Sequence, residues 1–439
     1  MSRTFPIIVA IMMVALLCAG CSDQSAQTTA PDAIRVGVVA SLTGSASSTG
    51  NDIWQSAVLA AEEINANGGV YVADIGKSLP IRVFQGDDES TREGGQKAVS
   101  KLITQDNVNL LVGGFSSAVV MAHQSIVADY SVPYIISGAS STAVSSRDDI
   151  DTSCMFYLRP SSDDSSIVTT LYAGNVLRPA INEKFGFSDD RPLRLAIIYQ
   201  DSPYGKGHQS AIHSTIESNG LNIDVVSEES FTMGESDFRT ILTAVKAKQP
   251  DAIYAVTFLN EQIPLVQQAR RDVGLDTIFL TIEPNDDPDY YAGVGRYGEY
   301  SLLESRFSPY AVPSGPTAAA VTDFVAAFDA RWDDYPGMMG AATYESMYVA
   351  AQAIENAGTL DKAAVRDALD AIEMPQMIEA MKNGVITFSD DCRVSSFELY
   401  MSQLIWDETA GEPRPKIIWP DSLKETDLVL PDWYAPGSA

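Results

Sequence analysis

The sequence predicts an α/β protein built of two successive units, each with a parallel sheet. Three observations lead to this prediction. From residue 34 onward, short apolar runs alternate with longer amphipathic stretches, and such runs are typical of strands that helices cover on both faces. The alternation restarts after Pro160, so that a second unit of similar size follows the first. The chain of 439 residues is long enough to hold both units.

The first unit opens with a strand over residues 34–40, which a polar loop follows. Apolar residues then recur at helical spacing, which predicts a helix over residues 53–64 that Gly68 and Gly69 end. The same criteria predict strands at residues 81–84, 110–112 and 134–136, and helices at residues 91–105 and 118–129.

The second unit repeats the pattern, with strands expected at residues 193–199, 223–226, 251–256 and 278–280, and helices at residues 205–219, 237–248 and 261–273. The alternation then breaks down, as expected if the chain crosses back to complete both units. In this last part we expect helices at residues 317–332, 341–357 and 361–371, and strands at residues 385–388, 397–405 and 416–419.

Residues 1–20 are predicted to be a signal peptide. Arg3 precedes an uncharged apolar run over residues 5–17, which is too short to span a membrane and suits the core of a signal sequence. The Ala-Gly-Cys sequence that ends at Cys21 resembles the lipobox of exported lipoproteins, in which the cysteine is acylated, and residues 21–33 would then form a flexible tether. Cys18 stands where an aliphatic residue is usual, so an ordinary signal peptide cleaved nearby is the alternative.

The charge balance argues against nucleic acid as a partner. The chain has 29 Lys and Arg against 58 Asp and Glu, for a formal net charge of −29. Such a surface repels phosphate backbones and anionic headgroups. Only three histidines occur, and no two of them stand at a metal-ligand spacing, so we expect no metal site.

Two cysteines remain beyond the N-terminal segment, Cys154 and Cys392. In an oxidising compartment an isolated pair predicts a possible disulfide, with two buried free thiols as the alternative.

The sequence lacks the common catalytic motifs. It contains no G-x-S-x-G elbow, no H-E-x-x-H, no P-loop and no C-x-x-C. We therefore expect neither catalysis nor a cofactor.

Two small-residue clusters are the best candidates for a ligand site. In the first, a strand ends in Gly-Gly before Ser116 and Ser117 open a helix, which presents N–H groups and hydroxyls to a carboxylate. The second contains Ala139, Ser140 and Ser141 after the next strand. In a parallel sheet both lie at the carboxyl ends of strands, where ligands bind. The alternatives are a serine N-cap without a ligand and a plain serine-rich connection.

The acidic stretch over residues 283–289 suggests a calcium loop, but it lacks the required spacing and contains two prolines, so we expect a solvated loop. Glu283 is a separate case, because it follows an apolar strand closely and so lies near the strand's carboxyl end.

Together these segments resemble the branched-chain amino-acid binding proteins, the type I periplasmic binding proteins that serve ABC importers. The resemblance extends from about residue 34 to residue 420. Its motifs occur in order at residues 37–44, 60–69, 87–88, 132–137, 156–160, 201–205, 237–238 and 268–270.

The resemblance implies a ligand set. Ser117, with Ser116 beside it, matches the serine that receives the ligand carboxylate, and Ala139 and Ser141 match the pair that holds the carboxylate and the ammonium. Tyr204 matches the second-lobe tyrosine before a glycine.

The acid that pairs with the ligand ammonium matches Glu283, and a buried cation needs such a charged partner. Two parts of the side-chain pocket depart from the family. Thr49 stands where the family has an aromatic residue, and the wall in the second lobe begins with Phe258. An amino acid is thus the expected ligand, and the sequence does not specify which side chain it carries.

The resemblance also implies the architecture: two flavodoxin-like lobes with parallel central sheets, joined by three crossovers near Pro160, Pro284 and Pro375. The expected boundaries are residues 34–159 plus 285–375 for lobe 1, residues 160–284 plus 376–425 for lobe 2, and residues 426–439 for a C-terminal tail.

The same resemblance implies that solute binds between the lobes, that they close by hinge motion, and that the closed form docks on an ABC transporter permease. We expect a monomer that acts outside the cytoplasm, held to the membrane through a lipidated Cys21. The alternatives are a ligand-sensing receptor module of the same fold, or a binder of an amide, urea or an aromatic acid.

Overall fold

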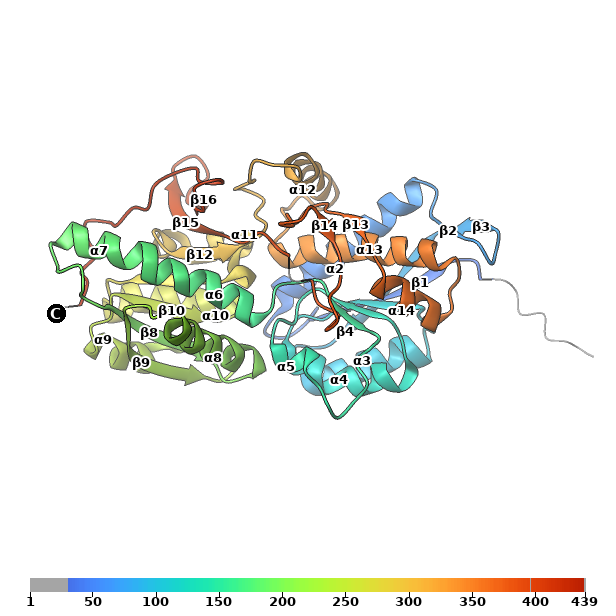
Figure 1. Cartoon of the computed structure of the whole chain (residues 1–439), viewed down its shortest axis with the longest axis horizontal. Helices are drawn as coiled ribbons and strands as arrows, with labels where there is room; N and C mark the ends of the chain where they lie inside the picture. The colour runs from blue at the N-terminus through green and yellow to red at the C-terminus, as the bar shows by residue number, and fades with distance from the viewer. Residues whose placement is uncertain (1–30, 395, 438–439) are drawn as a thin grey trace, which may run out of the picture. The chain divides into compact units, whose positions relative to one another are not determined.

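The computed structural model describes residues 31–394 and 396–437 of the chain, so Cys21 and the predicted signal peptide lie outside the described residues. Residues 33–437 build two main sheets with helices packed on them (Figure 1). We call each sheet with its helices a lobe, numbered in chain order. In both lobes the parallel strands lie in the order second, first, third, fourth, fifth, as in flavodoxin-like sheets.

The first sheet is wholly parallel, and it is buried except for parts of its edge strand over residues 81–87. In the strand over residues 34–40, Ile34 lies opposite Ile81 on one neighbour and Val36 opposite Leu110 on the other, and every residue except Arg35 is buried. Such a strand is a nearly continuous apolar run because helices cover both of its faces. In spatial order the strands are β4 (Ile81–Asp87), β1 (Ile34–Ala40), β5 (Leu110–Gly113), β6 (Tyr134–Ile136) and β7 (Met155–Tyr157).

The helices of the first lobe come from two distant parts of the sequence, since α13 packs against α2 and against β5. A small hairpin, β2 (Val70–Val72) and β3 (Lys77–Leu79), lies between α2 and β4. The helices are α2 (Ser47–Ala66), α3 (Arg92–Thr104), α4 (Ser117–Tyr130), α5 (Thr142–Ser145), α12 (Ala318–Trp332), α13 (Met338–Ala357) and α14 (Lys362–Asp370).

The second sheet has five parallel strands and two antiparallel ones at one edge. In spatial order these are β9 (Ile223–Phe231), β8 (Leu193–Gln200), β10 (Ala252–Val256), β11 (Ile278–Thr281), β12 (Leu302–Ser305), β15 (Tyr400–Asp407) and β16 (Glu412–Trp419).

The helix that starts at Pro203 begins where capping chemistry predicts. Ser202 accepts a hydrogen bond from the Gly205 amide, and Pro203 occupies the first turn, where its missing N–H costs nothing. The elements are α6 (Ser162–Tyr172), the π turn η1 (Ala173–Leu177), α7 (Arg178–Phe185), α8 (Pro203–Ser218), α9 (Arg239–Ala247), α10 (Leu259–Gln268), the π turn η2 (Ala269–Val273), the 3-10 turn η3 (Glu283–Asn285), α11 (Pro288–Val294) and the 3-10 turn η4 (Gly295–Gly298).

Two of the three expected crossovers lie elsewhere. The chain stays in the second sheet through β12, which pairs with β11, so it leaves after Ser305 and not near Pro284. Arg393 pairs with Tyr157 of the first sheet, so the last connection runs between residues 394 and 400, not near Pro375. β12 escaped prediction because Glu304 interrupts its short apolar run, although that side chain is fully buried. The hairpin β13 (Met374–Pro375) and β14 (Val385–Ile386) precedes this last connection.

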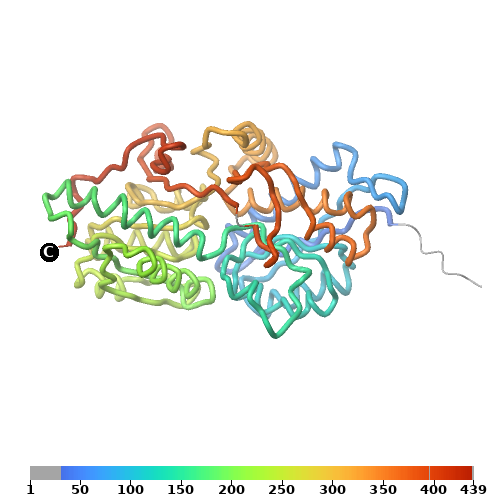
Figure 2. The backbone as a smooth tube through the Cα atoms, viewed as in Figure 1, coloured from blue at the N-terminus to red at the C-terminus, as the bar shows by residue number. Residues whose placement is uncertain are grey.

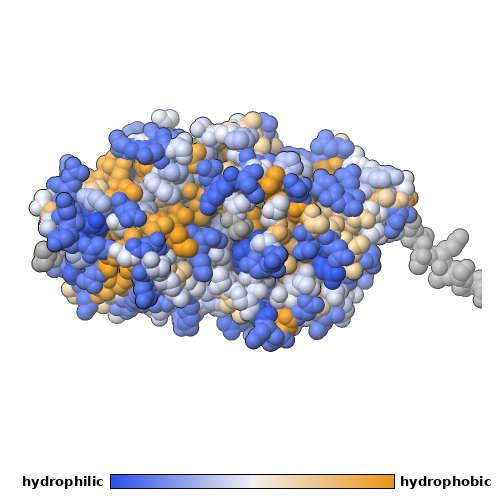
Figure 3. Space-filling view, viewed as in Figure 1, coloured by the Kyte–Doolittle hydropathy of each residue, from blue (hydrophilic) through white to orange (hydrophobic). Residues whose placement is uncertain are grey.

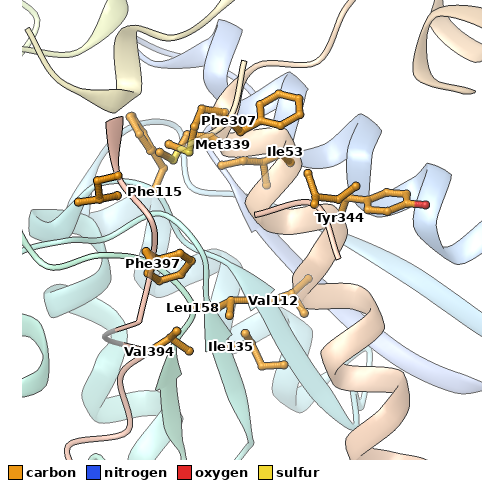
Figure 4. Close-up of a cluster of buried hydrophobic side chains, with 14 of the residues drawn as sticks. Ile53, Val112, Phe115, Ile135, Leu158, Phe307, Met339, Tyr344, Val394 and Phe397 are labelled. Atoms are coloured by element: carbon orange, nitrogen blue, oxygen red, sulfur yellow. The ribbon is translucent and has the colours of Figure 1, made fainter. Parts of the chain in front are cut away.

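Each of the three connections places an apolar side chain in one buried cluster. Leu158 comes from the first connection, Phe307 from the second and Phe397 from the third, and Figure 4 shows them gathered with Phe115 and Met339. This shared core fixes the three connections against one another.

The end of the chain returns to the second lobe, and Figure 2 shows its red trace running to the terminus there. Gln403 of β15 exchanges two hydrogen bonds with the backbone of Val429, and the Gly437 amide donates to Asp251 at 2.8 Å. On the face shown in Figure 3 the surface is mainly hydrophilic, with scattered apolar patches. Within residues 31–394 and 396–437, no helix has both the length and the apolar character that crossing a membrane requires.

Candidate functional site

The carboxyl edges of the two sheets face each other and touch. The loop after β5 meets the loops after β9 and β10, since Ser116 lies beside Met233 and Phe115 beside Phe258. The loop after β6 meets the start of α8, where Ser141 Oγ donates to the Pro203 carbonyl at 3.0 Å. In open α/β sheets this edge is the place where ligands bind.

The first-lobe half of the site is formed by two loops in close contact. Ser117 Oγ accepts a hydrogen bond from the Ser141 amide at 3.2 Å, so the structure brings together these two predicted residues. Gly138 permits this approach, because a Cβ there would lie 2.5 Å from the Phe115 Cα atom. Ser116 is the N-cap residue of α4, but its side chain makes no capping hydrogen bond and points to Met233.

Ala139 and Ser140 complete this half and are both buried. The Ser140 hydroxyl has no hydrogen-bond partner among the described residues, while its carbonyl accepts from the Ser162 amide. A buried hydroxyl without a partner is costly, so Ser140 has a donor and an acceptor left for a solute or a water molecule.

The second-lobe half is aromatic. The ring of Tyr204 lies 5.0 Å from Phe258 and 4.9 Å from His208, measured between centroids. Burial lowers the pKa of His208 to about 3 and raises that of Tyr204 well above its usual value, so both rings are neutral. Neutral rings offer an apolar wall to a ligand.

The two halves meet through a ring contact between lobes. Phe115 and Phe258 have centroids 4.5 Å apart at 44°, and both are at least 95% buried. Phe115 also belongs to the buried cluster that contains Met339 and Phe307 (Figure 4). The two lobes are therefore in direct contact at the site.

Thr49 lies in the first turn of α2 and is buried. Its neighbours reach the second lobe, since Ser48 donates to Asp289 and the Ser45 carbonyl accepts from Asn260 Nδ2. Thr49 thus directly follows a segment that makes two interlobe contacts.

Glu283 has a different environment from the one expected. One of its carboxylate oxygens pairs with Arg159 and the other with Arg306, and all three side chains are at least 98% buried. Arg306 also pairs with Glu379. Both oxygens of Glu283 are thus paired with buried arginines in this conformation, where the sequence suggested a ligand ammonium.

The acidic stretch that contains Glu283 is not the solvated loop that the sequence suggested. Asp286 accepts a hydrogen bond from Tyr291, Asp287 caps α11, and both are buried because they lie between α11 and the start of α13. Across the described ranges, no group of three or more His, Cys, Asp and Glu side chains is placed to hold a metal ion.

The predicted disulfide is not formed. Cys154 and Cys392 are free thiols that contact the same buried cluster beside β7. The number of cysteines does not fix the geometry that a bridge requires, and burial raises the pKa of both thiols, that of Cys154 to about 11.

Three site residues were not found from the sequence. Phe115 and Met233 make interlobe contacts, and Glu261 holds the second-lobe loops. Asn260, which the sequence placed in the second-lobe wall, also reaches the first lobe. For Phe115 a signal was present, since it stands between the Gly-Gly pair and the two serines.

Two paired α/β lobes with three connections, and facing polar and aromatic edges, define the class of type I periplasmic binding proteins. A sequence profile of the periplasmic binding protein family matches residues 33–404. The chain belongs to this family.

Relatives and solved structures agree with this assignment. The chain is 24% identical over 428 residues to the Leu/Ile/Val-binding protein homolog 7 of Brucella melitensis, covering 96% of this chain and 98% of that one. It is 26% identical over 282 residues to an amino acid binding protein of Pseudomonas aeruginosa, covering 64% and 69%.

Among solved structures, the substrate binding protein LivJ of Streptococcus pneumoniae in complex with isoleucine aligns with a TM-score of 0.71 at 21% identity, covering 88% of this chain and 100% of that one. A solute binding protein of Rhodopseudomonas palustris in complex with 3,4-dihydroxybenzoic acid aligns with a TM-score of 0.73 at 19% identity, covering 90% and 99%. These similarities concern the fold.

Proposed function

We propose that this protein captures a small carboxylate-bearing solute between its lobes and delivers it to an ABC transporter permease. The observation that carries the proposal is the meeting of Ser117, Ser140 and Ser141 in the first lobe with Tyr204 and Phe258 in the second. Hydroxyls and the N–H groups at the start of α4 suit a carboxylate. The aromatic wall suits the apolar part of the same molecule.

An amino acid is the solute that the relatives favour, since their names refer to leucine, isoleucine and valine. The protein would act without transforming the ligand, as a monomer outside the cytoplasm, tethered through an acylated Cys21. Mass spectrometry of the mature protein tests the tether: the expected N-terminus is a lipid-modified Cys21, and an unmodified N-terminus at another residue would exclude it.

A second candidate is an acid without an α-ammonium. It is favoured by Glu283, whose two oxygens are engaged by Arg159 and Arg306. Structural neighbours were solved with benzoate and 4-hydroxybenzoate. A ligand of this kind needs the serine hydroxyls and the aromatic wall, but it does not need an acidic side chain of the protein to pair with.

Isothermal titration calorimetry with L-leucine, L-isoleucine, benzoate and 4-hydroxybenzoate separates these candidates. Binding of either amino acid supports the first, and binding of only the benzoates supports the second. Ser117→Ala should weaken binding of whichever solute binds by about tenfold, the effect of one hydrogen bond to a charged group. Unchanged affinity in Ser117→Ala would remove this serine from the site, and a chain that binds no small carboxylate in a wider screen would refute the proposal.

A further inference from the structure

Glu261 is a buried carboxylate directly behind the second-lobe face of the site. It lies in the first turn of α10 and is 2% exposed. Its environment holds no arginine or lysine partner within hydrogen-bond distance among the described residues; instead, three neutral donors surround it. Burial raises the pKa of Glu261, and the amides of Gly234 and Phe258 oppose that rise.

Each donor lies at or just beyond the carboxyl end of a different strand. Oε1 accepts from the Gly234 amide at 2.7 Å, in the loop after β9. Oε2 accepts from the Phe258 amide at 2.9 Å, in the loop after β10. Gln200 Nε2, at the end of β8, donates to both oxygens at 3.0 and 3.1 Å. One carboxylate therefore joins the carboxyl ends of three neighbouring strands.

The segments around Glu261 and its donors include three residues that touch the first lobe. The ring of Phe258 contacts Phe115. Met233, which precedes Gly234, lies 3.9 Å from the Ser116 hydroxyl. Asn260, the residue before Glu261, donates to the Ser45 carbonyl.

We infer that Glu261 is a positioning residue for lobe closure: it fixes the second-lobe surface that docks on the first lobe, and so sets solute affinity without touching the solute. The affinity part rests on the proposed function, and the docking part does not. A charged acceptor that binds three donor groups fixes loop geometry more strongly than neutral pairs would. Pre-organised contacts of this kind reduce the entropy lost on closure.

Asp251 provides a matched control. It is also fully buried in the second lobe and accepts from Arg191, Arg194 and Gly437. It precedes β10, whereas Glu261 follows it, so Asp251 lies at the end of the strand that is away from the site. Both carboxylates hold several segments together, but only Glu261 holds segments that reach the first lobe.

Hydrogen–deuterium exchange on the full chain without solute tests the docking part. In Glu261→Gln, which keeps the shape but places a donor opposite the amide donors, first-lobe residues 44–49 and 113–118 should exchange several-fold faster. In Asp251→Asn these segments should exchange at the wild-type rate. Faster exchange confined to the second lobe of Glu261→Gln would overturn the inference.

Glu261→Asp, which keeps the charge but shortens the reach, should give a smaller effect in the same segments. If neither variant folds, Glu261 is required for the lobe itself and the inference fails. Calorimetry with L-leucine and benzoate then tests affinity: the probe that binds wild type should bind Glu261→Gln about tenfold more weakly. Equal affinity would overturn the affinity part, whereas a wild type that binds neither probe refutes those two ligands and leaves the exchange result to decide the docking part.

Discussion

Arg306 pairs with Glu283 at the point where the chain leaves the second sheet. Arg159, from the first connection, binds the other oxygen of Glu283, and Glu379, from the segment before the third connection, binds Arg306. All four side chains are at least 98% buried. Charges from the segments around all three connections are thus linked.

Glu283→Gln should lower the free energy of unfolding by about 3–5 kcal/mol, because it leaves two buried guanidinium groups without full charge compensation. Urea denaturation followed by circular dichroism measures this change. Glu62→Gln, which removes an exposed pair with Arg331, is the control and should leave the unfolding midpoint within error.

The same variant discriminates between two roles of Glu283. If Glu283 binds a ligand ammonium, Glu283→Gln weakens amino-acid binding selectively and hardly affects an ammonium-free acid. The buried pairs predict instead that the affinities for both ligands fall alike, because Glu283 holds the connections between the lobes together. A selective loss of amino-acid affinity would restore the role that the sequence suggested.

The prediction from the sequence was most successful where a structure depends on local pattern. β1 is an apolar run that only Arg35 and Gly37 interrupt, and its expected bounds are those observed. β12 was missed because Glu304, a buried acid, looks like a surface residue in a four-residue strand. The partners of Glu283 could not be foreseen for another reason: Arg159 is 124 residues away, and only the fold brings the two together.

The site also combines features that a local sequence pattern predicts with contacts that only the fold creates. Ser117 and Ser141 were predicted from small-residue loops at strand ends, and the structure joins them by a hydrogen bond. The ring contact of Phe115 with Phe258 needed the relative placement of two lobes, which no local pattern contains.

Stability should decrease as the pH rises from about 4 to about 7, partly through two buried carboxyl groups at the start of α13. Asp52 caps α13 by accepting from the Gly337 and Gly340 amides. Burial and the nearby Asp287 raise the pKa of Asp52 well above its usual value, and burial and Asp289 raise that of Asp287 to about 7. The folded protein keeps these protons at pH values where the unfolded chain has lost them, so folding is favoured below this window.

Thermal unfolding of Asp287→Asn across pH 4.5–8 isolates this contribution, because the variant removes one member of the pair. The difference in melting temperature between wild type and variant should shift steadily in favour of the variant as the pH rises. Asp286 and Asp334 also face these groups, so the slope is reduced and not abolished. A difference that is independent of pH would show that the two carboxyl groups do not titrate together.

Cys154 and Cys392 should both be alkylated by iodoacetamide in denaturant without prior reduction, since both are free thiols. In the native protein at neutral pH, Cys154 should react slowly, because burial hides it and raises its pKa to about 11. Peptide mass spectrometry reads each position separately. Protection of both positions in denaturant until a reductant is added would demonstrate a disulfide.

Removing residues 428–439 should destabilise the second lobe, because the last segment supplies partners to buried groups. The Gly437 amide and the Tyr434 hydroxyl both donate to Asp251, and the Arg191 guanidinium donates to the Gly437 carbonyl. Tyr434→Phe removes one of these bonds and should lower the free energy of unfolding by about 1 kcal/mol. The truncation loses several bonds and leaves Arg191 with fewer acceptors, so its effect should exceed that of Tyr434→Phe severalfold. Equal unfolding midpoints for the truncated and full chains would mean that the Arg191–Asp251 pair needs no support from the tail.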